Sequence, residues 1–192
     1  MSFMLLGILN SQAAGGGGGA YELLESTTLT SSANTITFSS LGSYSDYKHL
    51  QIRYSARSTS ANTNNGLSMQ FNGDTGSNYT FHRIQALTSS VDAYGRPSAS
   101  TSLSTGRITG GNAQASAFGS GLIDVLDFGS TQRYKTVRTL NGFANTAGAG
   151  YLISLSSGAW LNANAITSIE FKAESGSVNF AAGSSFILIG VK

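Results

Sequence analysis

YKHLQIRYSA, residues 47–56, alternates apolar and polar side chains. The apolar ones fall on one side of an extended chain: Leu50, Ile52, Tyr54 and Ala56. The polar ones fall on the other: His49, Gln51, Arg53 and Ser55. A period of two residues is that of a β-strand with one buried and one exposed face. The stretch therefore predicts a half-buried antiparallel strand.

The same pattern recurs on both sides of this strand. Shorter alternating runs contain Ile36 and Phe38, then Leu67, Met69 and Phe71, then Tyr79 and Phe81. Five further strands are predicted within 121–128, 133–143, 151–160, 166–173 and 185–192. Roughly ten strands at intervals of about 8 to 16 residues are typical of a sandwich or jelly roll. We therefore expect an all-β fold, an antiparallel β-sandwich or jelly roll.

Two connecting segments have a composition of their own. QFNGDTGSNYTF, residues 70–81, places Asn, Gly and Asp between two alternating runs, which predicts a β-hairpin with a tight turn. The stretch from Val91 to Ala117 is rich in Ser, Thr, Gly and Ala and contains the sole proline, Pro97. It has few apolar anchors, so we expect an extended surface loop.

The overall composition excludes several classes of protein. Charged residues make up 10% of the 192, against roughly 25% in an ordinary soluble domain. The 11 basic and 9 acidic residues are scattered singly, without the Lys/Arg cluster that a nucleic-acid partner requires. There is no cysteine, which rules out disulfides, thiolate metal sites and cysteine nucleophiles.

The N-terminal segment, residues 1–20, differs from the rest of the chain. Its apolar side chains are Phe3, Met4, Leu5, Leu6, Ile8 and Leu9, and five glycines follow: Gly15, Gly16, Gly17, Gly18 and Gly19. No Lys or Arg precedes Lys48, which argues against a secretory signal, and the apolar run is too short to span a membrane. We interpret residues 1–20 as a docking arm and residues 21–192 as the β-sandwich domain.

Residues capable of catalysis are few and dispersed. His49 and His82 are the only histidines, and neither is accompanied by the acid and nucleophile spacing of a catalytic triad. Asp124 and Asp127 are three residues apart, so on a strand they point to opposite faces and do not form a carboxylate pair. We therefore expect no catalytic residues and no enzyme activity.

Ligand-binding candidates are equally sparse. Asp74 lies in a turn that resembles a fragment of a calcium loop, but the other acidic ligands are missing. We therefore expect no metal site and no cofactor, although the sequence leaves an ion near Asp74 open. Tyr44, Tyr47, Tyr94 and Trp160 are able to stack on sugars if exposed, whereas burial in the core is the more usual place for such residues.

Three segments together resemble a known family. They are YELLESTTLTSSANTITFSSLGSYSDYKHLQIRYSARS (21–58), LIDVLDFGSTQRYKTVRTLNG (122–142) and NFAAGSSFILIGVK (179–192). The chain is similar to a family of tailed-bacteriophage virion structural proteins over roughly residues 20–192. Members end in a strand with the pattern GS-x-F-x-LYG-I/V-K/R, which is matched here by Gly183, Ser184, Phe186, Leu188, Gly190, Val191 and Lys192. Ile189 replaces the usual tyrosine and keeps the alternation.

The resemblance implies a β-sandwich on the exterior of the virion, with no catalytic residues. The expected partners are other virion proteins, either the major capsid protein or tail proteins, with many copies on each particle and neither nucleic acid nor membrane involved. A head decoration or cement protein is the first interpretation, since no coiled-coil heptads of a fibre shaft are present. A tail fibre or baseplate component and a carbohydrate-binding module that recognises host glycans remain as alternatives.

Overall fold

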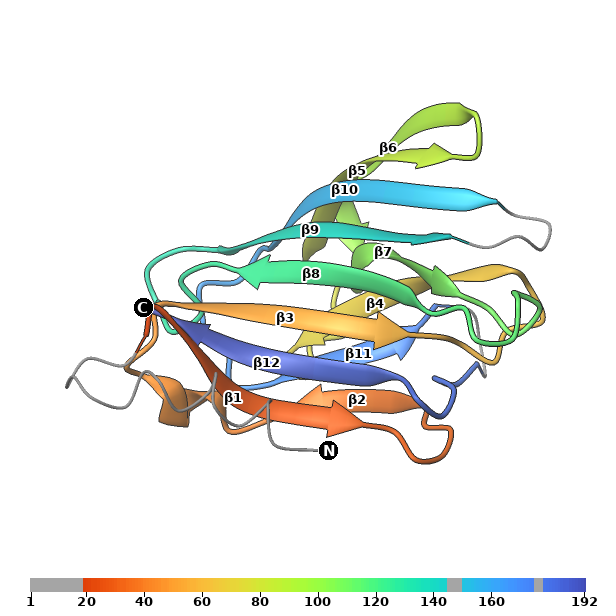
Figure 1. Ribbon diagram of the computed structural model, residues 1–192. Helices are drawn as coiled ribbons and strands as arrows, with labels where there is room; N and C mark the ends of the chain where they lie inside the picture. The colour runs from red at the N-terminus through yellow and green to blue at the C-terminus, as the bar shows by residue number, and fades with distance from the viewer. Residues whose placement is uncertain (1–18, 145–149, 175–177) are drawn as a thin grey trace, which may run out of the picture.

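Figure 1 shows a computed structural model of the chain, which describes residues 19–144, 150–174 and 178–192. Within these residues there are twelve β-strands and one short 3-10 helix, η1 (Leu41–Tyr44). The strands are β1 (Tyr21–Thr28), β2 (Thr35–Phe38), β3 (His49–Ala56), β4 (Asn64–Phe71), β5 (Tyr79–Leu87), β6 (Ser90–Ser100), β7 (Leu103–Thr109), β8 (Gly119–Val125), β9 (Lys135–Ala144), β10 (Tyr151–Trp160), β11 (Ile169–Ala173) and β12 (Ser185–Val191).

The described strands form two antiparallel sheets that pack face to face (Figure 1). The larger has eight strands in the order β1-β12-β3-β8-β9-β10-β5-β6, and the smaller has four in the order β2-β11-β4-β7. We call the face of the larger sheet that points away from the smaller one the outer face. The predicted all-β antiparallel sandwich is confirmed. The arm residues Phe3–Leu9 and Gly15–Gly18 lie outside the described residues.

An aromatic cluster in the core joins the two sheets. The ring of Phe186 on β12 lies 5.1 Å from that of Phe171 on β11, 5.4 Å from Phe180 and 5.5 Å from Tyr54 on β3, measured between centroids. All four residues are buried. Burial of each such side chain contributes about 1.5–3 kcal/mol, so this cluster is a main source of stability.

The strand predicted over residues 47–56 has the expected orientation. Leu50, Ile52, Tyr54 and Ala56 are buried between the sheets, while Arg53 is exposed on the outer face. β3 pairs with β12 on one side and β8 on the other, so it lies inside the larger sheet. A strand with neighbours on both sides and one covered face requires this alternation.

The hairpin predicted over residues 70–81 is wrong, although its turn is confirmed. Asn72 and Gly73 have positive φ angles of 53° and 67°. However, β4 belongs to the smaller sheet and β5 to the larger, so the turn carries the chain from one sheet to the other. The ring of Tyr79, the first residue of β5, packs against Phe71 and Trp160 in the core. Turn residues redirect the chain, but packing decides which sheet the next strand joins.

The long surface loop predicted over Val91–Ala117 is also wrong. β6 pairs with β5, and β7 pairs with β4. β6 lies at the edge of its sheet, where backbone hydrogen bonds hold a strand that has little to bury. β7 is anchored by only two large apolar side chains, those of Leu103 and Ile108. Both strands have a low apolar content, so the alternation of apolar and polar residues did not predict them.

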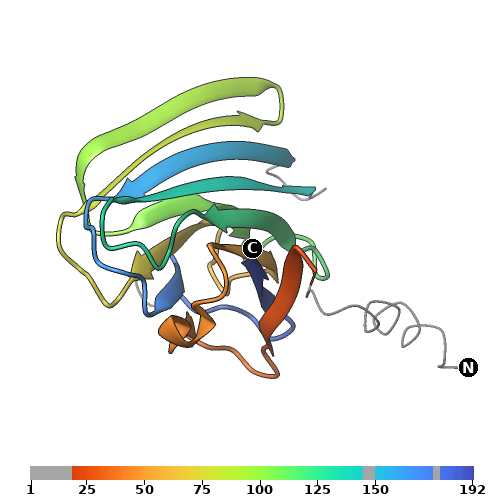
Figure 2. The same ribbon diagram turned by 90° about the vertical axis from the view of Figure 1, so that its left-hand side faces the viewer.

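The two sheets differ in width, and the hairpin β5–β6 extends beyond the smaller sheet (Figure 2). β7 is the last strand of the smaller sheet and contacts β9 and β10. The inner face of β5–β6 therefore overhangs the edge formed by β7. This difference in width leaves a part of the larger sheet uncovered on both faces.

Candidate functional site

The outer face of the larger sheet carries an exposed apolar patch. We call it the β9–β10–β5 patch and define it by Ile84, Leu140, Ile153 and Leu155, which are 51–59% exposed. Strand register places Leu140 opposite Leu155, and Leu155 opposite Ile84. Residues directly opposite on one face of a sheet have Cβ atoms about 4.5–5.5 Å apart. The patch is therefore a continuous row across three strands.

Neighbouring residues widen this row. Leu122 on β8 lies opposite Leu140, and Val91 on β6 lies opposite Ala86, beside Ile153. Gly142, opposite Ile153, has no side chain. A hollow of about 610 Å³ lies beside it and is lined in part by Leu122 and Leu140. Exposed apolar surface with a hollow is typical of a protein–protein contact. A single chain leaves this surface in water.

The pattern in the middle of β9 and β10 is inverted relative to an ordinary sandwich. On β10, Ile153 and Leu155 point to solvent, while Ser154 and Ser156 are buried. On β9, Leu140 points to solvent, while Thr139 and Asn141 are buried. In the middle of the two strands the larger side chains are thus turned away from the core, whereas Val137, Phe143 and Leu152 nearer the strand ends are buried. Alternation in the sequence predicts the strands, but it does not predict which set of side chains faces inward.

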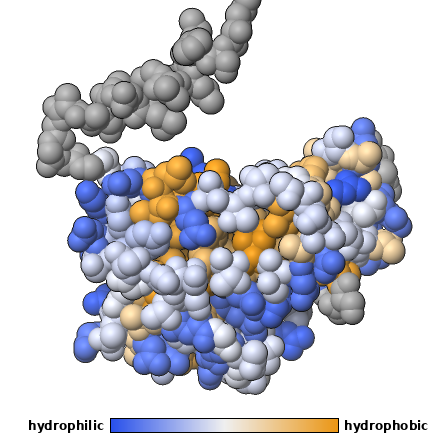
Figure 3. Space-filling model, turned by 90° about the horizontal axis from the view of Figure 1, so that it is seen from below, coloured by the Kyte–Doolittle hydropathy of each residue, from blue (hydrophilic) through white to orange (hydrophobic). Residues whose placement is uncertain are grey.

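A polar strip separates this patch from a second apolar region at the other end of the sheet. Gln51 Nε2 donates to Asp124 Oδ1 at 3.0 Å, and Arg53 Nε donates to Gln51 Oε1 at 3.0 Å. Beyond the strip, Tyr21 and Leu23 on β1 are 58% and 63% exposed. Figure 3 views the molecule from below, onto the edge of the sandwich where β1 and β2 lie, and shows apolar patches between polar side chains there. The outer face thus offers two apolar areas.

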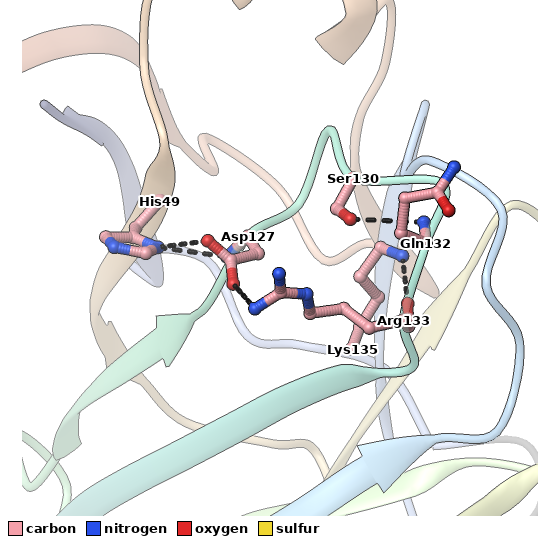
Figure 4. A network of polar contacts seen from close by, with 6 residues as sticks. All are labelled: His49, Asp127, Ser130, Gln132, Arg133 and Lys135. Atoms are coloured by element: carbon pink, nitrogen blue, oxygen red, sulfur yellow. Dashed lines mark hydrogen bonds and ion pairs between the residues drawn. The ribbon is translucent and has the colours of Figure 1, made fainter.

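His49, one of the two histidines considered above, belongs to a polar network in the segment after β8 (Figure 4). The backbone N–H of Asp127 donates to His49 Nδ1 at 2.9 Å, and the two side chains approach to 3.7 Å. Arg133 pairs with the other oxygen of Asp127 at 3.3 Å. Because Nδ1 accepts a backbone hydrogen bond, the histidine fixes this segment. No serine, threonine or lysine makes a hydrogen bond to His49 in the described residues.

Lys135 lies beside this network and is fully buried. Its Nζ donates to the carbonyl oxygens of Arg133 at 2.8 Å and Ala163 at 3.0 Å. Burial lowers the pKa of Lys135. A buried ammonium bonded to two carbonyls joins the β8–β9 segment to the one after β10, which is a structural role. Sequence analysis did not identify this residue.

Asp74 also has a structural role. Its Oδ2 accepts from Trp160 Nε1 at 2.7 Å and from Asn78 at 2.9 Å, and its Oδ1 accepts from the backbone N–H of Gly76 at 2.8 Å. The Trp160 hydrogen bond is the largest of the effects that lower the pKa of Asp74. Both carboxylate oxygens are therefore occupied by protein donors, which fixes the turn between the sheets.

The other predicted candidates are separated from one another. Asp124 contacts Gln51 and Arg138, whereas Asp127 contacts His49 and Arg133, so the two acids form no pair. His82 is exposed on the outer face. Of the four aromatic candidates, Trp160 is buried, Tyr44 and Tyr47 pack against the core, and Tyr94 is 41% exposed.

No group of three or more His, Asp and Glu side chains gathers as a metal site in the described part of the chain. None of the described helices is long and apolar enough to cross a membrane. Comparison with protein-family models gives no matching family, and comparison with curated protein sequences gives no matching relative. The site is therefore interpreted from its own geometry.

Proposed function

We propose that the chain is a non-enzymatic structural protein on the exterior of a tailed-bacteriophage particle, bound there to other virion proteins. The observation that supports this role best is the β9–β10–β5 patch. Leu140, Ile153 and Leu155 are exposed here, while the serines that alternate with them on β10 are buried. An exposed apolar surface of this kind is suited to contact with another subunit. The family resemblance in residues 21–58, 122–142 and 179–192 supplies the phage context.

The size of the patch is sufficient for association. Its four defining side chains are about half exposed, so covering them contributes about 3–6 kcal/mol before ordering costs. That is too little for a tight isolated complex but enough when many copies bind a repetitive surface and the arm residues Phe3–Leu9 add a second contact. Decoration of the head is our first assignment, and a tail fibre or baseplate position is the alternative.

Location on the particle is tested with antibodies raised against residues 21–192. Immunogold labelling of intact particles in the electron microscope is expected to give regular labelling over the head. Labelling confined to the tail supports the tail assignment and contradicts decoration. Particles without label, produced in cells that express the chain, would contradict a role in the virion.

The contact surface is tested by reattachment to particles stripped of the protein. The patch variant Ile153→Thr/Leu155→Thr and the arm variant Leu5→Ser/Leu6→Ser are compared with the control Ser157→Thr, which changes an exposed position on the same face of β10. We expect each double variant to attach about tenfold or more weakly. If the patch variant attaches like the control, the patch is not the contact surface.

A further inference from the structure

A groove lies on the opposite side of the larger sheet from the β9–β10–β5 patch, where the β5–β6 hairpin overhangs β7 (Figure 2). We call it the arginine groove and define it by Arg83, Tyr94, Arg96, Arg107 and Glu174. The resemblance and the proposed role account for none of these residues. They come from three strands, β5, β6 and β7, and from the end of β11, so no sequence motif brings them together.

One wall of the groove consists of aromatic and guanidinium groups on β5 and β6. Arg83 lies opposite Tyr94 in the register, and its guanidinium carbon is 5.2 Å from the centre of the Tyr94 ring. Arg96 Nε donates to the hydroxyl of Tyr94 at 3.0 Å, and the ring of Phe81 is 6.0 Å away. The tyrosine ring is therefore held in place by two arginines and a phenylalanine.

The rest of the lining consists of polar groups from the end of β6, the β6–β7 turn and the smaller sheet. The first cavity, of about 390 Å³, continues along Ser100, Thr101, Ser102 and Ser104 to Glu174. A second cavity, of about 220 Å³, is lined by Asn62, Asn64, Asn65, Gly66 and Arg107. Arg83 and Glu174 line both cavities. A Cβ atom on Gly66 would lie 2.1 Å from Glu174 Oε2, so the glycine leaves space for this carboxylate.

The groove has more positive than negative charge. Three guanidinium groups, those of Arg83, Arg96 and Arg107, line it with one carboxylate, that of Glu174. Among the described residues, the buried Nε atoms of Arg83 and Arg107 have no hydrogen-bond partner. Burial and the neighbouring Arg83 lower the pKa of Arg107. An added anion would therefore stabilise the charged form of this arginine.

We propose that the arginine groove binds a saccharide that carries a carboxylate group, such as a uronic or sialic acid residue of a surface glycan. Guanidinium groups bind carboxylates through paired hydrogen bonds, and the groove is lined by those of Arg83, Arg96 and Arg107, of which Arg83 and Arg107 are half-buried. The Tyr94 ring presents an aromatic face to the apolar side of a sugar ring, and the serine and asparagine side chains match its hydroxyl groups. The combined cavities have the size of a ligand site.

Other anions fit the groove less well. A phosphate monoester carries up to two negative charges, so Glu174 repels it more strongly than it repels a singly charged carboxylate. A nucleic-acid strand requires a basic track along its backbone. The formal net charge is only +2, and the three arginines of one groove do not extend into such a track. A carboxylated saccharide therefore fits the residues best.

The binding experiment uses the full chain on a glycan array. The array carries uronic-acid and sialylated oligosaccharides, each beside its carboxyl-reduced neutral form, together with sulfated and phosphorylated oligosaccharides and a single-stranded oligonucleotide. We expect binding to carboxylated members and none to their reduced forms. Binding of reduced forms, stronger binding of sulfate, phosphate or oligonucleotide, or no binding at all overturns the proposal.

Variants then assign the binding to the groove. Calorimetric titration with the best carboxylated oligosaccharide is expected to show about tenfold to a hundredfold weaker binding for Arg83→Gln. Tyr94→Ala weakens binding while Tyr94→Phe retains it. The control Arg138→Gln removes an exposed arginine from the outer face and leaves binding unchanged. If Arg83→Gln binds like the wild type while remaining folded, the groove is not the site.

The variants distinguish a failure of the attachment proposal from a failure of the glycan proposal. The patch variant Ile153→Thr/Leu155→Thr changes the outer face and is expected to keep glycan binding, whereas Arg83→Gln is expected to keep attachment to particles. Loss of attachment with retained glycan binding locates assembly in the patch. If the array shows no binding and attachment is normal, only the glycan inference is overturned.

Discussion

The space between the two sheets has two parts of opposite character. Around Phe186 the layers enclose aromatic rings, and the cluster of Tyr54, Phe171 and Phe180 fills the gap. Under β7 the larger sheet presents a polar layer, which we define as Gln85, Thr139, Asn141, Ser154 and Ser156. Each of these five side chains has a buried oxygen without a hydrogen-bond partner among the described residues.

The two parts of the core contribute differently to stability. Aromatic packing under β2, β11 and β4 provides the free energy of folding. The polar layer contributes little, because unpaired buried polar groups cost free energy. The β9–β10–β5 patch lies on the outer side of the same strands that carry the polar layer. The arginine groove lies at the edge of this part of the sheet. The aromatic core and the two surfaces proposed for binding thus lie at opposite ends of one sandwich.

The largest expected effect is in the aromatic cluster. Phe186→Ala leaves a cavity among three rings and is expected to reduce the free energy of unfolding by about 3–5 kcal/mol. Ile187→Ala, one residue further along β12 and partly exposed on the outer face, is the matched control with a loss below about 1.5 kcal/mol. Urea denaturation at neutral pH measures both. Equal losses would mean that the cluster is not the main source of stability.

A smaller effect is expected at the turn that crosses between the sheets. Hydrogen bonds from Trp160, Asn78 and Gly76 keep the pKa of Asp74 below its ordinary value of 3.8. Because the folded pKa is below the unfolded one, the stabilisation is present above the unfolded pKa and is lost as the pH falls through the folded pKa. Asp74→Asn is therefore expected to cost about 1–3 kcal/mol at pH 7 and much less near pH 2. Urea denaturation at both pH values tests this, and an equal cost at both contradicts it.

The groove end of the molecule is expected to respond to pH in the opposite direction. Burial raises the pKa of Glu174, with Ser104 and the arginines opposing the rise. A raised folded pKa means that stability is highest below the unfolded pKa and is lost as the pH rises through the folded pKa. Glu174→Gln is therefore expected to gain stability relative to the wild type between pH 4 and pH 8, by less than Asp74→Asn loses. Thermal unfolding of both proteins across this range measures the difference in stability. If the stability of both proteins changes with pH in the same way, the expectation is wrong.

The smallest effect is expected in the polar layer. The hydroxyl of Ser156 is buried and has no partner among the described residues. Ser156→Ala removes an unpaired group with almost no change of shape, so the stability is expected to change by less than about 0.5 kcal/mol or to rise slightly. Urea denaturation beside Phe186→Ala measures this. A loss comparable with that of Phe186→Ala would remove the distinction between the two parts of the core.

The strands with strong alternation were predictable from the sequence, and the weak ones were not. β3 and β12 alternate cleanly because one face packs on the aromatic core. β6 and β7 are held by pairing with β5 and β4, a non-local property that their Ser- and Gly-rich sequence does not reveal. The turn at Asn72 was predictable from its preference for positive φ, whereas the sheet that receives β5 depends on long-range packing.

The site was less predictable than the fold. The apolar residues of YLISLSS were visible, but their direction depends on the partner strands, and here Ile153 and Leu155 face solvent. Arg83, Arg107 and Glu174 are far apart in the sequence and meet only because β5, β7 and β11 converge. The one local sign is Gly66, whose missing side chain leaves space for a carboxylate. The role of Phe3–Leu9 remains a prediction.

The two edges of the larger sheet have a consequence for behaviour at high concentration. The edge strand β1 contains a register shift between Leu23 and Glu25, and β6 contains Pro97 and pairs irregularly near Phe81. A proline and a bulge interrupt the row of backbone groups to which a strand of another molecule would add. At high concentration, strand-to-strand addition between copies of the chain is therefore disfavoured. Contacts between copies are then made by side chains on the faces of the sheets.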